Sequence, residues 1–173
     1  GAESYASEEV CADLLFTVPV LLNASVGTTD LVAGVDTVRW MLPVDMDTLA
    51  FIEPYSISVH RIDQSGASTL IFTSPNVSST SLLPTEYLDA SIPTATTQHQ
   101  YTVTVNSNGA VAGVSAAATT VYLEKLLIDN RAYLSWTEEV PWTNTDYVVE
   151  RFDAGAWVAL ATVQNQTYVD SGL

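Results

Sequence analysis

The sequence predicts an all-β protein made of antiparallel sheets packed face to face. Short segments in which apolar and polar residues alternate are separated by turn residues at regular intervals, which is typical of β-sandwiches. Tyr55–Ile62 alternates over a full strand, and Asp63–Gly66 has the composition of a hairpin turn. Much of the pattern in residues 37–62 returns in residues 133–152, so the chain contains two copies of one β unit.

The first copy spans residues 18–123 and contains about seven expected strands, enough for two antiparallel sheets. They are an edge strand beginning at Pro19, then Val35–Trp40, Tyr55–Ile62, Thr69–Ser74, Ser79–Leu83 with Glu86–Leu88, Tyr101–Val105 and Val111–Leu123. The proline near the start of the first strand favours an edge position, because proline cannot donate a ladder hydrogen bond.

The second copy is incomplete. Its expected strands are Leu126–Ile128, Ala132–Trp136, Asp146–Phe152, Trp157–Val163 and the segment of residues 166–173. No counterpart of Tyr101–Leu123 follows, so we expect Trp136 and Tyr147 to be partly uncovered core residues. Either the natural polypeptide continues, which is the favoured expectation, or something else supplies the missing strands. Residues 1–13 match the end of the first copy, which predicts three parts: the last strand of a preceding domain (1–13), a complete domain (14–123) and the start of another (124–173).

These features resemble tandem fibronectin type III domains, which are seven-stranded immunoglobulin-like sandwiches. Trp40 and Trp136 match the tryptophan of the second strand in that family, and Tyr101 matches the tyrosine that leads its sixth strand, which implies core positions. The amino-acid sequences of residues 38–57, 134–151 and 167–173 are similar to repeats of Bacteroidota cell-surface proteins that end in a gliding-motility-associated C-terminal domain.

That resemblance implies type IX secretion and a place outside the cell or on the bacterial surface, in proteins of gliding motility and adhesion. Expected partners are neighbouring domains of the same longer chain and secretion-system or cell-surface proteins. The sorting domain that marks type IX export is not in this sequence. The Arg-Gly-Asp tripeptide of some animal relatives is also absent, so integrin binding is not implied.

Composition excludes several classes of function. Twenty acidic against five basic residues give a formal net charge of −15, which repels nucleic acid and anionic membranes. No apolar run is long enough to span a membrane. The single cysteine, Cys11, cannot form a disulfide within the chain, so it either pairs outside it or fills an apolar position.

No catalytic site is predicted. His60 and His99 are the only histidines, neither has metal ligands at a suitable spacing, and no Gly-x-Ser-x-Gly nucleophile turn exists. Both are therefore expected to be surface imidazoles. Arg61 and Arg151 occupy equivalent positions and are expected to pair with nearby carboxylates in a structural role.

Residues 42–54 form a polar, proline-bearing loop with candidate binding groups. Asp45, Asp47 and Glu53 are candidate Ca²⁺ ligands, but the loop lacks the glycine and terminal glutamate of a Ca²⁺-binding loop. A solvated acidic loop, with Asp47 capping a turn with Thr48, is the favoured interpretation, so no cofactor is predicted.

Exposed aromatic residues are candidates for a sugar-stacking face: Phe51, Tyr55, Trp142 and Trp157. For Trp142, which follows Pro141, packing against the hairpin is the favoured alternative. Thr48 and Thr37 lie in Asp-Thr-aliphatic triplets that resemble Bacteroidota O-glycosylation acceptors.

The function that these observations favour is non-catalytic. The chain is expected to be a spacer segment of a large secreted or cell-surface protein, presenting a distal adhesive or catalytic domain. One alternative is a carbohydrate- or protein-binding module that uses the 42–54 loop and the hairpin tips. Another is a set of accessory domains of an extracellular enzyme.

Overall fold

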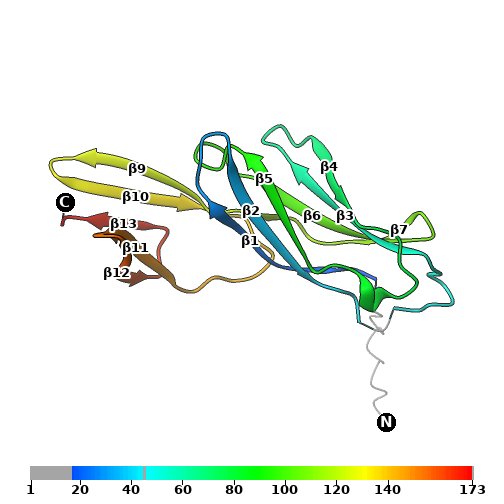
Figure 1. Ribbon diagram of the computed structural model, residues 1–173. Helices are drawn as coiled ribbons and strands as arrows, with labels where there is room; N and C mark the ends of the chain where they lie inside the picture. Colours follow the sequence, from blue (N-terminus) through cyan, green and yellow to red (C-terminus); the bar gives the residue numbers. More distant parts are fainter. Residues whose placement is uncertain (1–16, 45, 173) are drawn as a thin grey trace, which may run out of the picture.

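The computed structural model describes residues 17–44 and 46–172, and they form an all-β structure of antiparallel strands, as predicted (Figure 1). The strands are β1 (Val20–Thr28), β2 (Gly34–Met41), β3 (Tyr55–Ile62), β4 (Ser68–Thr73), β5 (Glu86–Ile92), β6 (Gln100–Ser107), β7 (Ala110–Val114), β8 (Ala118–Thr119), β9 (Tyr122–Ile128), β10 (Arg131–Thr137), β11 (Tyr147–Asp153), β12 (Ala156–Val163) and β13 (Thr167–Asp170). The helical element of the described residues is one 3₁₀ turn, η1 (Thr80–Leu82), and no helix there could cross a membrane. Cys11 and the strand expected in residues 1–13 lie outside the described residues.

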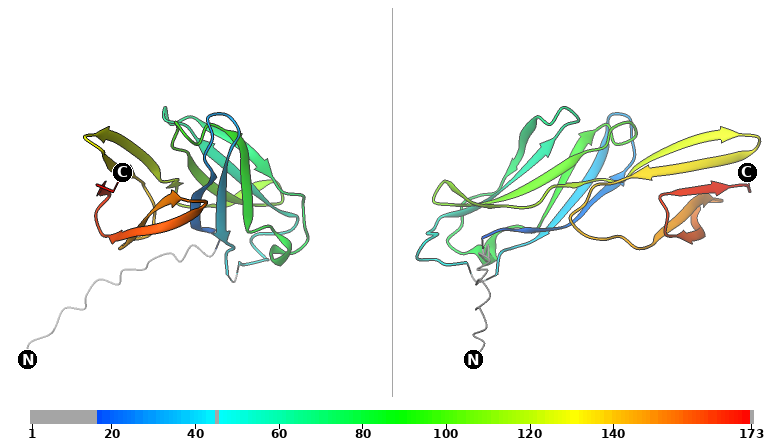
Figure 2. Two further views of the ribbon diagram at one scale, coloured as in Figure 1. Left: turned by 60° about the vertical axis from the view of Figure 1, so that its left-hand side comes forward. Right: turned by 180° about the vertical axis from the view of Figure 1, so that it is seen from behind.

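The first unit, strands β1 to β8, is a sandwich of two sheets. One sheet has the order β1-β2-β5, which places β1 at an edge as its proline predicts. The other has the order β4-β3-β6-β7, with β8 pairing β6 beyond β7. The two sheets lie face to face in both views of Figure 2.

The core of the first unit follows from period-two alternation, which sends every second side chain inward. On β2 the buried positions include Val38 and Trp40, and on β6 they include Tyr101, Val103 and Val105. All five are at most 2 % exposed. Contacts between these inward faces hold the two sheets together, because burying each large apolar side chain stabilises the fold by about 1.5–3 kcal/mol.

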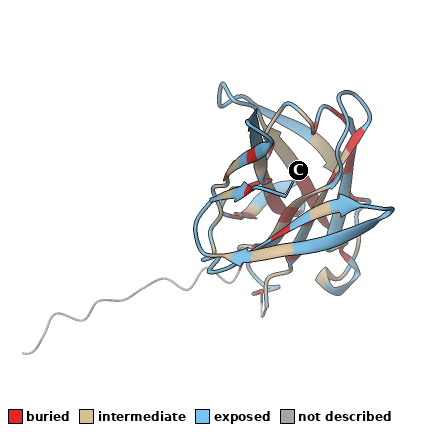
Figure 3. Ribbon diagram, turned by 90° about the vertical axis from the view of Figure 1, so that its left-hand side faces the viewer, coloured by how far each residue is buried: buried red, intermediate tan, exposed pale blue. Residues whose placement is uncertain are grey.

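The second unit, strands β9 to β13, contains a three-stranded sheet, β13-β10-β9, and the separate hairpin β11-β12. It lies beyond one end of the first unit (Figures 1 and 2). Trp136 on β10 and Tyr147 on β11 connect its two layers, with ring centroids 5.3 Å apart. Figure 3 shows long exposed stretches on these strands, in contrast to the buried centre of the first unit.

Two predicted strands were wrong. Val111–Leu123 is interrupted after β7, because Ser115 Oγ accepts the Val103 N–H while the Ser115 N–H donates to the Val103 carbonyl. The side chain thus occupies a place in the ladder, and the chain then forms β8 and enters β9 at Tyr122. Ser79–Leu83 is not extended: Ser79 caps η1 by accepting the Ser81 N–H, a local bond that competes with strand pairing.

Two strand pairings of the first unit recur position by position in the second. Asp36 faces Asp89 across β2 and β5, and Ala132 faces Asp170 across β10 and β13; each of Asp36 and Ala132 lies four residues before its tryptophan. The β3–β4 hairpin has a register shift directly after Val59, and β11–β12 has one directly after Val149. The second unit therefore repeats the order of five strands of the first. The registers of β2–β5 and β3–β4 recur in β10–β13 and β11–β12, whereas β1–β2 has two register shifts that β9–β10 lacks.

Candidate functional site

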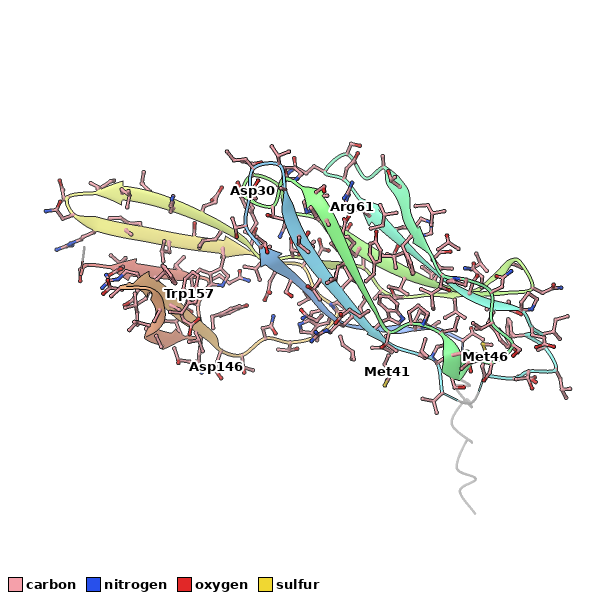
Figure 4. All side chains as sticks on the ribbon, in the orientation of Figure 1. Asp30, Met41, Met46, Arg61, Asp146 and Trp157 are labelled. Carbon is pink, nitrogen blue, oxygen red and sulfur yellow. The ribbon has the colours of Figure 1, made fainter. Side chains whose placement is uncertain are left out.

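A network of polar side chains lies in the centre of the first unit. Asp36 and Asp89 are buried, and Tyr101 Oη lies 2.8 Å from Asp36 Oδ2 and 2.9 Å from Asp89 Oδ2. Arg61 Nη1 donates to Asp89 Oδ2 at 2.6 Å, and His99 Nδ1 lies 2.7 Å from Asp36 Oδ2. Because β2 and β5 supply the carboxylates while β3 and β6 supply Arg61 and Tyr101, the network joins the two sheets. Figure 4 labels Arg61 beside β5 and β3.

Charge and proton balance explain the composition of this network. Burying two carboxylates is costly unless cations and donors compensate them. Arg61 supplies one positive charge beside Asp89, and the His99 ring lies at hydrogen-bond distance from Asp36. Burial raises the pKa of the Tyr101 phenol well above its ordinary 10.0, and the charges of Asp36 and Asp89 raise it further. Tyr101 therefore stays protonated and donates its one proton to the two carboxylates in turn.

The network is a structural element and is closed to substrates. Asp36 and Tyr101 are 0 % exposed, so no substrate reaches them. The Thr120 hydroxyl accepts the His99 backbone N–H. The prediction that His99 is a surface imidazole was wrong, because its ring enters the sandwich to compensate Asp36. His60 lies half-buried on β3.

The second unit keeps half of this network. Arg151 Nη1 donates to Asp170 Oδ2 at 2.9 Å, just as Arg61 pairs with Asp89. The prediction that Arg61 and Arg151 pair with carboxylates is thus confirmed. Ala132 stands at the position of Asp36, so the second unit has one buried carboxylate in place of two.

The two units are joined by hydrogen bonds at a short junction. Gln98 Nε2 donates to the Thr120 carbonyl at 2.8 Å and to the Thr137 carbonyl at 3.0 Å, which belong to the two different units. Thr119 and Glu139 form a reciprocal pair: the Thr119 N–H donates to the Glu139 carbonyl at 2.8 Å, and the Glu139 N–H donates to Thr119 Oγ1 at 2.7 Å. Only Thr120 and Val121 separate β8 from β9.

An open hollow of about 670 Å³ lies in the second unit and extends to β1. Most of its large lining side chains are apolar or aromatic; they include Leu134, Trp136, Trp142, Tyr147, Val149 and Trp157. The Glu138 carboxylate accepts the Tyr147 hydroxyl at 2.7 Å, and this bond raises the pKa of Tyr147. Figure 4 places Trp157 and Asp146 on this unit, away from Arg61.

In the 42–54 loop, the Asp47 carboxylate caps a turn, which was the interpretation favoured over calcium binding. Its Oδ1 accepts the Leu49 N–H at 2.9 Å and the Ala50 N–H at 3.4 Å, which is an Asx turn. Asp45 lies outside the described residues, and Glu53 is exposed. Among residues 17–44 and 46–172, no group of three or more carboxylate, histidine or cysteine side chains is placed to hold a metal ion.

The candidate binding aromatics do not form one face. The expectation that Tyr55 is exposed was wrong: it is 3 % exposed and donates its hydroxyl to the Phe51 carbonyl at 2.7 Å. Phe51 and Trp142 are half-buried and pack against the core of the first unit. Trp157 is 67 % exposed and packs edge-on against Phe152.

The candidate glycosylation residues differ in access. Thr48 is exposed in the 42–54 loop, whereas Thr37 is half-buried in the middle of β2. Trp40, Tyr101 and Trp136 are buried in their units, and Tyr147 is half-buried.

Sequence reasoning missed the buried network, although one signal was available. Asp36 shares the inward face of β2 with Val38 and Trp40, and an aspartate at an inward position needs a partner. Gln98 carried no such signal, because its role depends on where the second unit lies. Comparisons of the sequence with protein-family models and with curated proteins find no match.

Proposed function

We propose that the chain is a non-catalytic spacer segment of a secreted or cell-surface protein, built from fibronectin type III-like domains in tandem. The first domain ends near Thr120, and the next begins with β9. Placement on a bacterial surface after type IX secretion rests on the sequence resemblance to Bacteroidota repeats. The acidic net charge of −15 suits a soluble exterior segment.

The repeated register supports the tandem part of this proposal. Two segments of one chain share strand order, the position of a bulge, a buried tryptophan and an Arg–Asp pair. Such a set is expected when one sandwich is repeated. The carboxylates and the tyrosine of the first unit's polar network are buried, so the network stabilises a domain and gives no support to catalysis.

The junction carries the spacer function. Gln98 links carbonyl groups of both units, and Thr119 and Glu139 are bonded to each other twice. Because two residues separate β8 from β9, there is little free backbone to bend. A junction held in this way restricts interdomain motion and makes a semi-rigid rod.

Replacing Gln98 by alanine is expected to loosen the rod without unfolding either unit. The substitution removes amide hydrogen bonds worth roughly 1 kcal/mol each. In ¹⁵N relaxation of the chain 1–173, both units of the unchanged protein should show one common rotational correlation time. In Q98A the two times should separate, and small-angle scattering should give a broader distribution of end-to-end lengths.

Gln64→Ala is the matched control, since Gln64 lies on the exposed hairpin of the first unit. It should leave both measurements unchanged. A freely jointed chain in the unchanged protein, or equal behaviour of Q98A and Q64A, contradicts the spacer proposal.

The binding-module alternative is favoured by one observation on the 42–54 loop. Leu49 is 93 % exposed at its tip, and Val44 and Ile52 are also exposed. Burying one such side chain against a partner stabilises a complex by about 1.5–3 kcal/mol, which is about tenfold or more in affinity. If the loop binds glycans, Leu49→Ser should reduce retention on a glycan array about tenfold; unchanged retention removes this alternative.

A further inference from the structure

Among residues 17–44 and 46–172, strand β11 has a free edge that its counterpart in the first unit does not have. β3 pairs with β4 on one side and with β6 on the other. Within the described part of the chain, β11 pairs with β12 alone. We propose that this edge and the adjoining hollow bind an antiparallel β-strand in which a tyrosine is followed by apolar residues at every second position. The inference rests on the tandem-domain function proposed above.

The first unit specifies the register of the incoming strand. Across β3 and β6, Arg61 faces Tyr101, Val59 faces Val103 and Ile57 faces Val105. The bulge after Val59 corresponds to the bulge after Val149, so Arg151, Val149 and Tyr147 take the places of these three β3 residues. The incoming tyrosine should therefore face Arg151, and its next two apolar residues should face Val149 and Tyr147.

The hollow provides the space for the inward side chains of such a strand. In the first unit Tyr101, Val103 and Val105 are all 0 % exposed and fill the space beneath Trp40. In the second unit Trp136 lines an open volume of about 670 Å³, which is room for roughly 20 water molecules at ~30 Å³ each. Its apolar lining favours apolar side chains over water.

The Arg151–Asp170 pair provides the polar recognition. In the first unit Tyr101 Oη donates to Asp89 Oδ2, the same oxygen that Arg61 holds. Asp170 Oδ2 accepts Arg151 in the same way, and Asp170 Oδ1 accepts the Gly172 N–H. Ala132 stands in place of Asp36, so Asp170, the counterpart of Asp89, is the acceptor expected for an incoming hydroxyl beside Arg151. Tyrosine should therefore bind better than phenylalanine.

The free edge of β11 and the apolar hollow beside it together favour a polypeptide strand over other occupants. A row of unpaired backbone N–H and C=O groups is a template for strand addition, and pockets for alternate side chains give the specificity. A sugar or a lipid would fill the hollow without pairing the edge of β11. The occupant is therefore a strand with the chemistry of β6.

A peptide with the sequence of Gln100–Ser115, which carries β6 and β7, tests the proposal with the chain 1–173. Saturable binding is expected in fluorescence anisotropy, together with slowed hydrogen exchange at alternate amides of β11. Tyr101→Phe in the peptide should weaken binding about fivefold, the loss of one hydrogen bond. Asp170→Asn in the protein should remove that preference. A peptide with Val103→Asp and Val105→Asp should not bind.

Absence of saturable binding, equal binding of the Val→Asp peptide, or slowed exchange at another sheet edge overturns the proposal. A second measurement uses a chain that is extended by a copy of Pro93–Thr120 directly after Leu173. The copy begins at Pro93 because Leu173 aligns in sequence with Ile92. Its second unit should unfold at a higher urea concentration than that of the chain 1–173, and the same extension with Tyr101→Asp and Val103→Asp should show no increase. Failure of the spacer function would instead appear in the Gln98 experiment, with peptide binding unchanged.

Discussion

Replacing Arg61 by methionine should lower the free energy of unfolding of the first unit by about 3 kcal/mol. Methionine keeps an unbranched apolar stem but removes the cation that compensates Asp89 and Asp36. Breaking a buried pair on one side costs about 3–5 kcal/mol, and the lower end applies because the Arg61 side chain is 29 % exposed. Urea unfolding followed by amide resonances of β2 and β6 measures the loss in the first unit alone.

The second unit supplies the matched control for this substitution. Arg151→Met removes the corresponding cation beside one buried carboxylate, Asp170, in a unit that is more open to solvent. Its effect on β10 and β13 should be smaller than that of R61M on the first unit. Equal losses of unfolding free energy in the two units would contradict this account. They would show that a second buried carboxylate, Asp36 beside Asp89, does not increase the stabilisation that Arg61 provides.

Replacing Tyr101 by phenylalanine should lower the free energy of unfolding of the first unit by about 2–3 kcal/mol at neutral pH. The ring still fills the core, but two buried carboxylate oxygens lose their shared donor, and leaving a buried acceptor unpaired costs about 1–3 kcal/mol or more when it is charged. Urea unfolding of the two proteins measures the difference. A change below about 0.5 kcal/mol would contradict the role given to the hydroxyl.

The same pair of proteins gives a pH test with a defined sign. The folded protein raises the pKa of Tyr101, so this residue's contribution is fully present below its unfolded pKa of 10.0 and is lost as the pH rises above it. Phenylalanine has no such dependence. The stability difference between unchanged protein and Y101F should therefore shrink above pH 10, by about 1.4 kcal/mol per pH unit.

The fold class was predictable because apolar alternation and turn residues act locally. Tyr55–Ile62 was placed to the residue, since the strand alternates strictly in sequence and is followed by a turn that begins with Asp63 and ends with Gly66. Val111–Leu123 was not, because the interruption at Ser115 depends on a bond to Val103 in a neighbouring strand. The presence of a strand can be predicted from the local alternation of apolar and polar residues. A break such as that at Ser115 cannot, because it depends on a hydrogen bond to a residue on another strand.

The buried network was only partly predictable, for the same reason. The Arg61 and Arg151 pairs could be inferred from their repeated positions, and the inward place of Asp36 on β2 was visible in the alternation. The insertion of His99 could not be inferred, because residues 93–99 form a connection without a periodic pattern. Tyr55 was wrongly predicted to be exposed, because an aromatic residue at the start of a strand can lie either on the surface or in the core.

Hydrogen exchange of the backbone amides of β3 and β11 tests the central claim most directly. In that claim β11 is the counterpart of β3, and one of its edges has no partner in the part of the chain that the structure describes. The N–H groups of β3 that face β6 should exchange at the slow rate of the core of the first unit. The corresponding N–H groups of β11 should exchange orders of magnitude faster, while those that face β12 remain slower. Equal protection of both edges of β11 would contradict the account.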